Sequence, residues 1–528
     1  MLADDDTCYE VFKAHDARFD GRLFVGVTST GVYCRPVCRV RTPRIENCRF
    51  FSTAAQAEAA TFRPCMKCRP EIAPGPSLAW SVMDASRTLA IQAAQWLEQQ
   101  AGAQVDASIA GLADHLGVSD RHLRRIFFTE HGVTPLQFLQ TRRLLLAKQL
   151  LTDTGLPVSQ VALASGFRSL RRFNAAFTEH YRMSPTRLRG GANEPDHAPS
   201  PETLQVILAY RPPFDIDALL HFLSVRAIPG IEQVQGRCVR RSLRAGAVMA
   251  GHTQAAAGWV EVEFMADTAT RSARVRVSFP STLAAASGAV LASVRRWLDL
   301  DADPTAIDAA LSDLPGPPGL RVPASIDAFE MAVRAVLGQQ VTVAAARTLA
   351  CRLVARFGEP AVTPWPDVNR LFPQPERLAL APVEQIAELG IIRGRAGAII
   401  ALAQAWPELA LSLQQRQHPE PLIERLCALP GIGPWTAHYI AMRALGWPDA
   451  FPPRDVAVLK AMNQLTGTAD FRAATAHAER WAPWRSYAVL RLWNSLTPSA
   501  FTPPPIAASG LSKKARTKAR SDVPEKAP

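Results

Sequence analysis

The 528-residue chain lacks any apolar run close to the ~20 residues that a membrane-spanning helix requires. It also lacks a signal-peptide pattern, because its first residues include the acidic segment from Asp4 to Asp6. Its nine cysteines do not form the disulfide framework of a small secreted domain, since the chain is far too long for one. We therefore expect a monomeric bacterial protein of the cytoplasm, without a membrane partner.

Length and charge narrow the class further. A chain of this length predicts about three to five domains, and its 48% apolar and 20% charged residues are ordinary for globular proteins. The net charge of +12 indicates an anionic partner, although it could serve solubility alone. Between Ser119 and Arg189 there are twelve Lys and Arg against four Asp and Glu, and residues 513–520 form a basic tail. This clustering favours nucleic acid as the partner, with the tail as a disordered, salt-sensitive contact.

Four of the cysteines are grouped in two pairs. Cys34 and Cys38 enclose three residues, Cys65 and Cys68 enclose two, and 26 residues separate the pairs. Thiolates at this spacing suit tetrahedral zinc, which can hold together a domain with a small core. The alternative is four unrelated core cysteines. The other five are interpreted as packing residues: Cys8, Cys48, Cys238, Cys351 and Cys427.

The segments 30–39 (TGVYCRPVCR) and 62–68 (FRPCMKC) resemble the N-terminal domain of the Ada family of alkylation-response proteins. The resemblance implies that the four cysteines bind one Zn²⁺ and that Cys34 accepts a methyl group from a methylphosphotriester in DNA. Zinc keeps thiols deprotonated, and a four-thiolate site repels phosphate, so that methylation of Cys34 would raise DNA affinity. A zinc ribbon that only supports folding remains the alternative.

Two basic segments have helix-turn-helix character. Residues 109–127 and 158–174 each hold a short helix, a turn and a basic second helix. In the first of these segments, Ser119 or Asp120 is suited to cap the second helix. The pair resembles the DNA-binding domain of AraC-type regulators, in which both second helices enter the major groove. A solvated basic helix face is the alternative. The residues expected to face phosphates or bases are Arg121, Arg124, Arg125, Arg168, Arg171, Arg172 and Asn174.

After a Gly- and Pro-rich linker at 190–201, the pattern changes to alternating strands. We predict strands at 203–210, 259–264 and 274–279 and a helix at 216–226. The segments 211–215 (RPPFD) and 232–234 (EQV) resemble the N-terminal α+β domain of AlkA-type glycosylases.

The turn at 429–435 (LPGIGPW) predicts a hairpin between two helices, at 421–428 and 436–445. Gly431 and Gly433 would permit positive φ and a close approach of a DNA backbone to the N–H groups at the helix start. An ordinary turn with a C-cap glycine is the alternative. Together with segment 326–344, this hairpin resembles the helix-hairpin-helix of AlkA-type 3-methyladenine DNA glycosylase II.

Asp455 precedes a predicted helix at 456–465 and is suited to cap it. By the resemblance it is also the catalytic carboxylate, which stabilises positive charge at C1′ while the base leaves. Trp435 stands where strand-cutting relatives carry a Schiff-base lysine, so we expect a monofunctional enzyme.

The resemblance also implies a binding pocket for the flipped base. Trp435, Tyr439 and Trp493 would line it, because aromatic faces attract the positive charge of an alkylated base. Taken singly, each is more often a core aromatic. Gln340 falls at the position of the DNA-intercalating wedge, which is apolar in the best-known members of the family. A monovalent cation would bind the carbonyls of the hairpin, those of Cys427, Leu429 and Ile432.

The sequence thus predicts a multidomain α+β protein that removes alkylated bases and senses methylation. Its partners would be damaged and operator double-stranded DNA in the nucleoid, and RNA polymerase if it activates transcription. No Pro-Cys-His-Arg motif is present, so repair of O6-methylguanine is not expected. The alternative is a transcriptional regulator with an inactive glycosylase half. The predicted parts are 1–76 (zinc), 84–189 (helix-turn-helix), 190–201 (linker), 202–313 (α+β), 314–505 (glycosylase) and 506–528 (basic tail).

Overall fold

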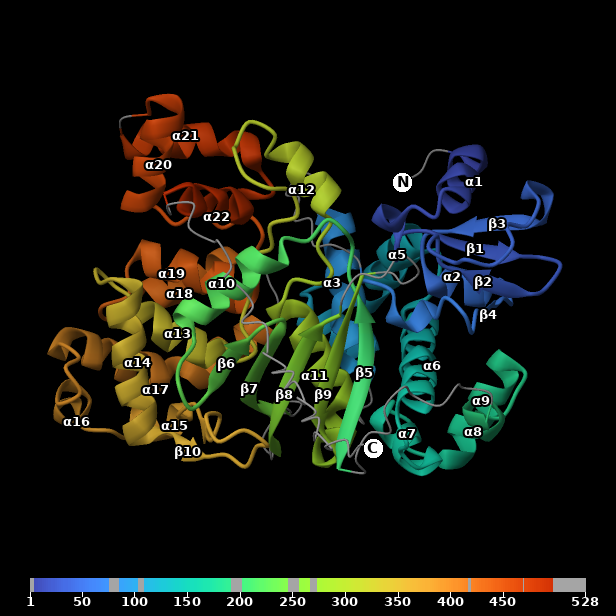
Figure 1. Cartoon of the computed structure of the whole chain (residues 1–528), viewed down its shortest axis with the longest axis horizontal. Helices are drawn as coiled ribbons and strands as arrows, with labels where there is room; N and C mark the ends of the chain where they lie inside the picture. Colours follow the sequence, from blue (N-terminus) through green and yellow to red (C-terminus); the bar gives the residue numbers. More distant parts are fainter. Residues whose placement is uncertain are drawn as a thin grey trace, which may run out of the picture.

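The computed structural model describes residues 4–75, 85–102, 109–190, 202–245, 256–265, 273–415, 419–468 and 470–496. The predicted basic tail and, beyond Gly190, the predicted linker lie outside these ranges. A five-stranded sheet lies between the helical domain built from α13–α22 and the part that contains the zinc and helix-turn-helix regions (Figure 1). The predicted multidomain α+β class is confirmed. None of the helices in the described ranges is long and apolar enough to cross a membrane.

The first domain is a small sheet of order β3-β1-β2-β4. Strand β2 pairs in parallel with β4, with Tyr33 opposite Pro64. Cys34 and Cys65 come directly after these two residues, so they lie next to each other where the pairing ends. The Cys65 N–H donates to the carbonyl of Tyr33 over 3.0 Å. The elements are α1 (Asp5–Lys13), β1 (Phe24–Val27), β2 (Val32–Cys34), β3 (Cys48–Phe51), α2 (Ala54–Ala59) and β4 (Arg63–Pro64).

Seven helices follow in the described residues, and side-chain caps mark the starts of three of them. The Ser119 side chain accepts from the His122 N–H at the start of α5, and Ser169 accepts from Arg172 at the start of α8. Thr134 begins α6 with a capping box. The helices are α3 (Ala85–Gln100), α4 (Ile109–His115), α5 (Asp120–His131), α6 (Pro135–Asp153), α7 (Val158–Ala164), α8 (Leu170–Tyr181) and α9 (Pro185–Gly190).

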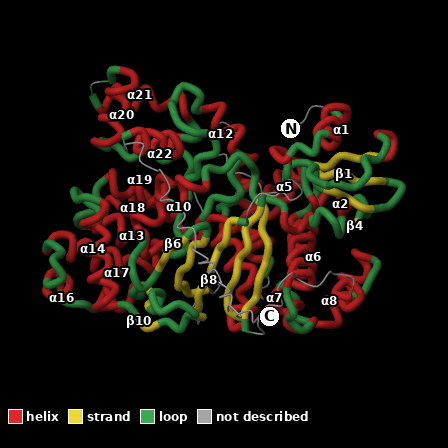
Figure 2. The backbone as a smooth tube through the Cα atoms, in the orientation of Figure 1, coloured by secondary structure: helices red, strands yellow, loops and turns green. Residues whose placement is uncertain are grey.

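The central sheet is antiparallel throughout, with the order β5-β9-β8-β7-β6. Figure 2 shows its strands in yellow in the middle of the molecule. Alternate residues of β5 are buried, which is the pattern that predicted the strand. All three predicted strands and the predicted helix are present. The elements are β5 (Thr203–Ala209), α10 (Ile216–Arg226), β6 (Glu232–Gln235), β7 (Cys238–Ala245), β8 (Ala256–Phe264), β9 (Arg274–Pro280), α11 (Ser287–Trp297) and α12 (Pro304–Ala310).

The last domain is helical apart from one short strand pair, β10 (Glu359–Pro360) with β11 (Arg370–Leu371). Its buried apolar residues belong to the same core cluster as those of the sheet, so the two parts are packed together. Its helices are α13 (Ala328–Leu337), α14 (Val343–Phe357), α15 (Pro375–Ala379), α16 (Val383–Ala387), α17 (Arg393–Gln415), α18 (Pro419–Cys427), α19 (Pro434–Ile440), a π-helical turn (Ala441–Leu445), α20 (Val456–Thr466), α21 (Phe471–Ala478) and α22 (Arg485–Ser495).

Arg211 joins the zinc domain to the sheet domain. Its guanidinium is fully buried and donates to the carbonyls of Asp20 (2.9 Å), Gly75 (2.6 Å) and Asp301 (2.6 Å). Burial lowers the pKa of Arg211 to about 10. The Asp20 carboxylate in turn pairs with Arg35, the residue after Cys34. A single side chain therefore contacts residues from both halves of the chain.

Replacing Arg211 by Met should loosen this junction. Three buried carbonyls would lose their donor at a cost of about 1 kcal/mol each, so we expect a loss of about 3 kcal/mol. Differential scanning calorimetry should show the zinc domain melting earlier and separately. Arg18→Met is the matched control, because Arg18 is exposed and, among the described residues, its side chain pairs with Asp16 alone. An equal effect of both variants would contradict this role of Arg211.

Candidate active site

The predicted hairpin joins α18 to α19, and its two glycines play different roles. Gly431 has a φ of +77°, and a Cβ there would lie 2.9 Å from the Cβ of Ala398. Gly433 has a φ of −93° and forms the N-cap of α19 without a side-chain hydrogen bond. The prediction of a left-handed conformation is therefore wrong for Gly433, because an N-cap residue has extended backbone. A Cβ on Gly433 would meet no atom within 4 Å, so this glycine leaves open space beside the helix start.

Gln339 is hydrogen-bonded to the hairpin, a role that no pattern in the sequence predicted. Its amide Nε2 donates to the Gly431 carbonyl over 2.9 Å and to the Thr436 hydroxyl over 3.0 Å. Gln340, the predicted wedge residue, follows in the turn between α13 and α14. It is exposed and has a φ of +53°, which is unusual for a residue with a Cβ. The same turn thus holds the hairpin on one side and projects Gln340 to the surface.

Asp455 is buried and lies at the N-cap of α20. Its Oδ1 accepts from the Val458 N–H over 2.8 Å, the predicted capping bond. Two indoles also donate to the carboxylate: Trp435 Nε1 to Oδ2 at 2.8 Å and Trp493 Nε1 to Oδ1 at 3.3 Å. Three N–H donors from three elements therefore fix the orientation of one carboxylate, which is more than a helix cap requires.

The three predicted pocket aromatics come together around this carboxylate. The rings of Trp435 and Tyr439 are stacked, with centroids 5.2 Å apart and planes 7° apart. Tyr439 and Trp493 have centroids 6.2 Å apart. All three side chains are half-buried, so an apolar aromatic wall with a fixed carboxylate reaches the surface. This arrangement can hold a flat, positively charged group and stabilise a second positive charge next to it.

The hairpin carbonyls predicted to hold a cation are partly engaged already. The Leu429 carbonyl accepts from the Ile432 N–H over 3.2 Å. The carbonyl of Gly431 between them accepts from Gln339.

The helix-turn-helix region keeps its predicted contact residues at the surface. All seven predicted contact residues are exposed. On α5, Arg124 pairs with Asp120 at 2.8 Å and Arg125 contacts the His122 ring at 3.1 Å. These exposed pairs are weak and are readily exchanged for phosphate. The exposed residues are Arg121, Arg124, Arg125, Arg168, Arg171, Arg172 and Asn174.

The four grouped cysteines form a compact, buried cluster. Their sulfur atoms all lie within 4.8 Å of one another. Burial and the neighbouring sulfurs raise the pKa of Cys68 well above its ordinary value, so four thiolates need a cation between them. The Arg35 N–H donates to Cys68 Sγ over 3.3 Å. The donor set fits a tetrahedral zinc site. All four residues are buried to a similar degree, so exposure does not distinguish one as the methyl acceptor.

Comparison with known proteins matches four segments of the chain to known domains. Residues 7–71 match the metal binding domain of Ada, and residues 112–191 match a helix-turn-helix domain. Residues 205–327 match the AlkA N-terminal domain, and residues 333–486 match the HhH-GPD superfamily of base excision DNA repair proteins. A Mycobacterium tuberculosis protein named "Probable bifunctional transcriptional activator/DNA repair enzyme AlkA" is 38% identical over 506 residues, which cover 94% of this chain and 97% of that protein. The chain belongs to this family of Ada–AlkA fusion proteins.

Each half of the Ada–AlkA fusion also matches a separate protein. DNA-3-methyladenine glycosylase 2 of Escherichia coli is 36% identical over 287 residues, which cover 54% of this chain and 95% of that enzyme. The E. coli "Bifunctional transcriptional activator/DNA repair enzyme Ada" is 32% identical over 190 residues, 36% of this chain and 50% of that protein. The predicted composition of the fusion, from zinc domain to glycosylase domain, is confirmed.

Proposed function

We propose that this Ada–AlkA fusion is a DNA glycosylase that hydrolyses the N-glycosidic bond of alkylated bases such as 3-methyladenine and 7-methylguanine. One observation carries the proposal: the Asp455 carboxylate is held by the indoles of Trp435 and Trp493 beside the stacked ring of Tyr439. A base that leaves the duplex would lie against the aromatic wall, where its positive charge is favourable by ~0.5–2 kcal/mol. Asp455 would then stabilise positive charge at C1′ and orient the attacking water.

The product would be an abasic site in an intact strand. Trp435 fills the hairpin position at which strand-cutting relatives carry their lysine, and an indole cannot form an imine. Gln340 would enter the space left by the flipped base, and Gly431 and Gly433 would lie against the DNA backbone. A monovalent cation at the carbonyls of the hairpin would strengthen that contact.

The test uses the purified full-length chain and duplex DNA treated with a methylating agent. Free 3-methyladenine and 7-methylguanine should appear, and the strands should break only after alkali. Strand cleavage without alkali, or covalent trapping with borohydride, would contradict the monofunctional assignment. Intact DNA with no released base would leave only the regulatory role and would overturn the proposed activity.

The N-terminal half would sense alkylation and read an operator. Cys34, Cys38, Cys65 and Cys68 would hold Zn²⁺, which keeps these thiols deprotonated and therefore nucleophilic. Cys34 would take a methyl group from a DNA phosphotriester, and the exposed arginines of α5 and α8 would bind double-stranded DNA. As an activator the protein would contact RNA polymerase, acting as a monomer in the bacterial nucleoid. The functional parts would be those predicted: 1–76, 84–189, 202–313 and 314–505, with a linker at 190–201 and a tail at 506–528.

A further inference from the structure

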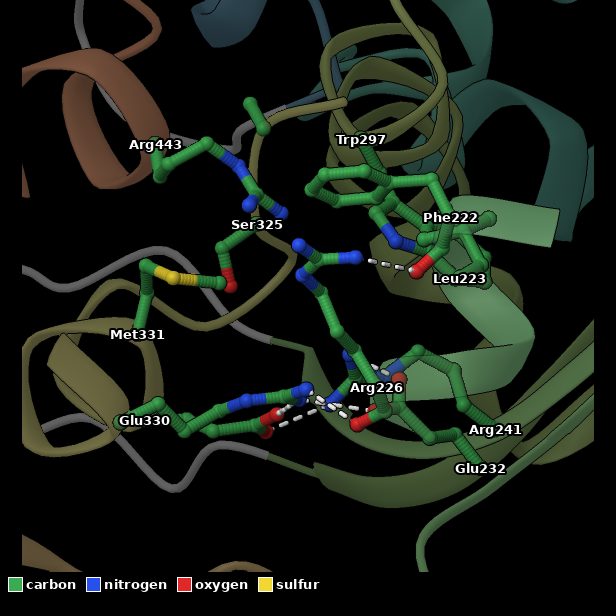
Figure 3. A pocket seen from close by; sticks show the side chains of 12 residues that line it. Phe222, Leu223, Arg226, Glu232, Arg241, Trp297, Ser325, Glu330, Met331 and Arg443 are labelled. Atoms are coloured by element: carbon green, nitrogen blue, oxygen red, sulfur yellow. Dashed lines mark hydrogen bonds and ion pairs between the residues drawn. The ribbon is translucent and has the colours of Figure 1, made fainter. Parts of the chain in front are cut away.

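Two arginines face each other behind the ring of Tyr439. Arg443, one helical turn after Tyr439, donates from Nη1 to the Tyr439 hydroxyl over 3.0 Å and from Nε to the Pro323 carbonyl over 2.5 Å. Arg226, on α10, donates from Nη1 to the Phe222 carbonyl over 3.3 Å, and its guanidinium carbon lies 3.8 Å from the centroid of the Phe222 ring. Figure 3 shows the two guanidinium groups pointing toward one another. Both arginines line a cavity of about 20 Å³.

The residues that line this cavity carry more positive than negative charge. They include four arginines and two glutamates, which leaves a net charge of +2. Glu330 pairs with Arg241 at 2.6 Å and with Arg334 at 2.9 Å. Glu232 pairs with Arg334 at 2.7 Å. Among the described residues, no carboxylate lies within ion-pair distance of the two facing arginines, so the excess positive charge lies on them.

Like charges that face each other away from water repel strongly, and buried charges are normally paired with an opposite charge. The contacts of Arg226 and Arg443 in the described residues are carbonyl oxygens, ring faces and a hydroxyl, and none of these groups brings a carboxylate. Burial, together with the charges of Arg443 and Arg334, lowers the pKa of Arg226 to about 10. A negative ion between the two guanidinium groups would remove this conflict.

The cavity has the size and the donors for such an ion. A volume of about 20 Å³ exceeds the ~10–15 Å³ that one water molecule needs, so a chloride ion or another small anion fits. A guanidinium has five N–H donors and no acceptor. Arg443 is only 3% exposed, and no hydrogen-bond partner of its Nη2 lies among the described residues. A buried donor group thus remains for a ligand in the cavity.

We propose that Arg226 and Arg443 form a binding site for a small monovalent anion such as chloride. The ion accepts hydrogen bonds from both guanidinium groups and halves the net charge of the cavity lining. This site does not depend on the proposed glycosylase activity. It does bear on that activity, because Arg443 is bonded to Tyr439: the ion lowers the positive charge that a cationic base would meet behind the aromatic wall.

The first test measures stability and needs no enzymatic activity. The melting temperature of the full-length chain is followed as sodium gluconate is replaced by sodium chloride at constant ionic strength, which keeps screening constant. Chloride that binds only the folded state should raise the melting temperature by about 3–6 °C when its concentration is tenfold above its dissociation constant. Arg226→Met should remove most of this rise. An equal rise in both proteins, or a rise in neither, would overturn the proposal.

Two further variants separate this site from other effects of chloride. Arg491→Met also removes a buried arginine, but Arg491 pairs with Asp308, so the melting temperature should fall while its dependence on chloride stays. Arg393→Met removes an exposed arginine that pairs with Glu384 and should change neither. A chloride dependence that disappears in Arg491→Met or Arg393→Met as well would contradict a specific site at Arg226 and Arg443.

The second test locates the ion. Bromide has the charge and nearly the size of chloride and scatters X-rays anomalously, so crystals of the full-length chain are grown in sodium bromide. The anomalous difference map should show a peak between the guanidinium groups of Arg226 and Arg443, and no peak there in crystals of Arg226→Met. Peaks confined to exposed arginines and lysines would show an adventitious ion only and would overturn the proposal.

Discussion

Replacing Asp455 by Asn should lower base release from alkylated DNA by at least about 1000-fold. Asn is nearly isosteric and caps helices as well as Asp does, so α20 keeps its first turn through the bond to Val458. What is lost is the full negative charge at the position where positive charge develops on the sugar. The Asn Oδ1 can still accept from Val458 and Trp493, but its NH₂ group takes the place of Oδ2 and cannot accept from Trp435, which costs about 1 kcal/mol of stability.

The chain offers a matched control for this experiment. Asp470 is also a helix N-cap of the same domain, and its Oδ1 accepts from the Ala473 N–H over 2.8 Å. Asp470→Asn should leave base release unchanged, because this carboxylate is exposed and caps its own helix without accepting from an indole of the aromatic wall. Single-turnover release and fluorescence anisotropy on duplex DNA separate chemistry from binding. If Asp455→Asn keeps release within a few-fold of the wild type, Asp455 is a helix cap only.

The features that the sequence predicted correctly are those with local signals. The Leu-Pro-Gly-Ile-Gly turn, the Asp455 cap and the paired cysteines each depend on residues close together in the chain, so residue type and spacing were sufficient. The error at Gly433 has the same origin. Two glycines one residue apart look equivalent in sequence, but only Gly431 is pressed against Ala398, while Gly433 starts a helix.

The features that sequence could not reveal depend on contacts between distant segments. Arg211 and Asp20 are 191 residues apart, and nothing near either one marks a buried contact. Arg443 shows both kinds of feature. Trp435, Tyr439 and Arg443 are spaced four residues apart, which places them on one helix face, and Arg443 Nη1 donates to the Tyr439 hydroxyl over 3.0 Å. The contacts of Arg443 with the Pro323 carbonyl and with the Phe222 ring of α10 could not be identified without the fold.

The methyl acceptor gives an all-or-none prediction. After incubation with DNA carrying methylphosphotriesters, mass spectrometry should find one added methyl group per chain, on Cys34, and none in Cys34→Ser. The new bond is S–CH₃, the broken bond is the O–CH₃ bond of the triester, and the phosphodiester leaves with the negative charge that the thiolate brought. A serine hydroxyl is not ionised at neutral pH and cannot replace the thiolate. Cys48→Ser, in the same domain, should behave as the wild type.

The transfer should also change DNA affinity. One negative charge disappears from the zinc centre, and at ~8 Å from a phosphate this is worth about 0.5–2 kcal/mol, or roughly 2- to 30-fold in operator affinity. The gain should shrink as salt rises, because the phosphate contact is screened. Cys34→Ser removes the same negative charge as methylation does, without adding a methyl group. This variant should bind the operator more tightly than the unmethylated wild type. Metal analysis must show that it retains zinc. A methyl group on Cys38, Cys65 or Cys68 instead of Cys34 would reassign the acceptor. An operator affinity that does not change with methylation would show that the zinc centre serves folding alone.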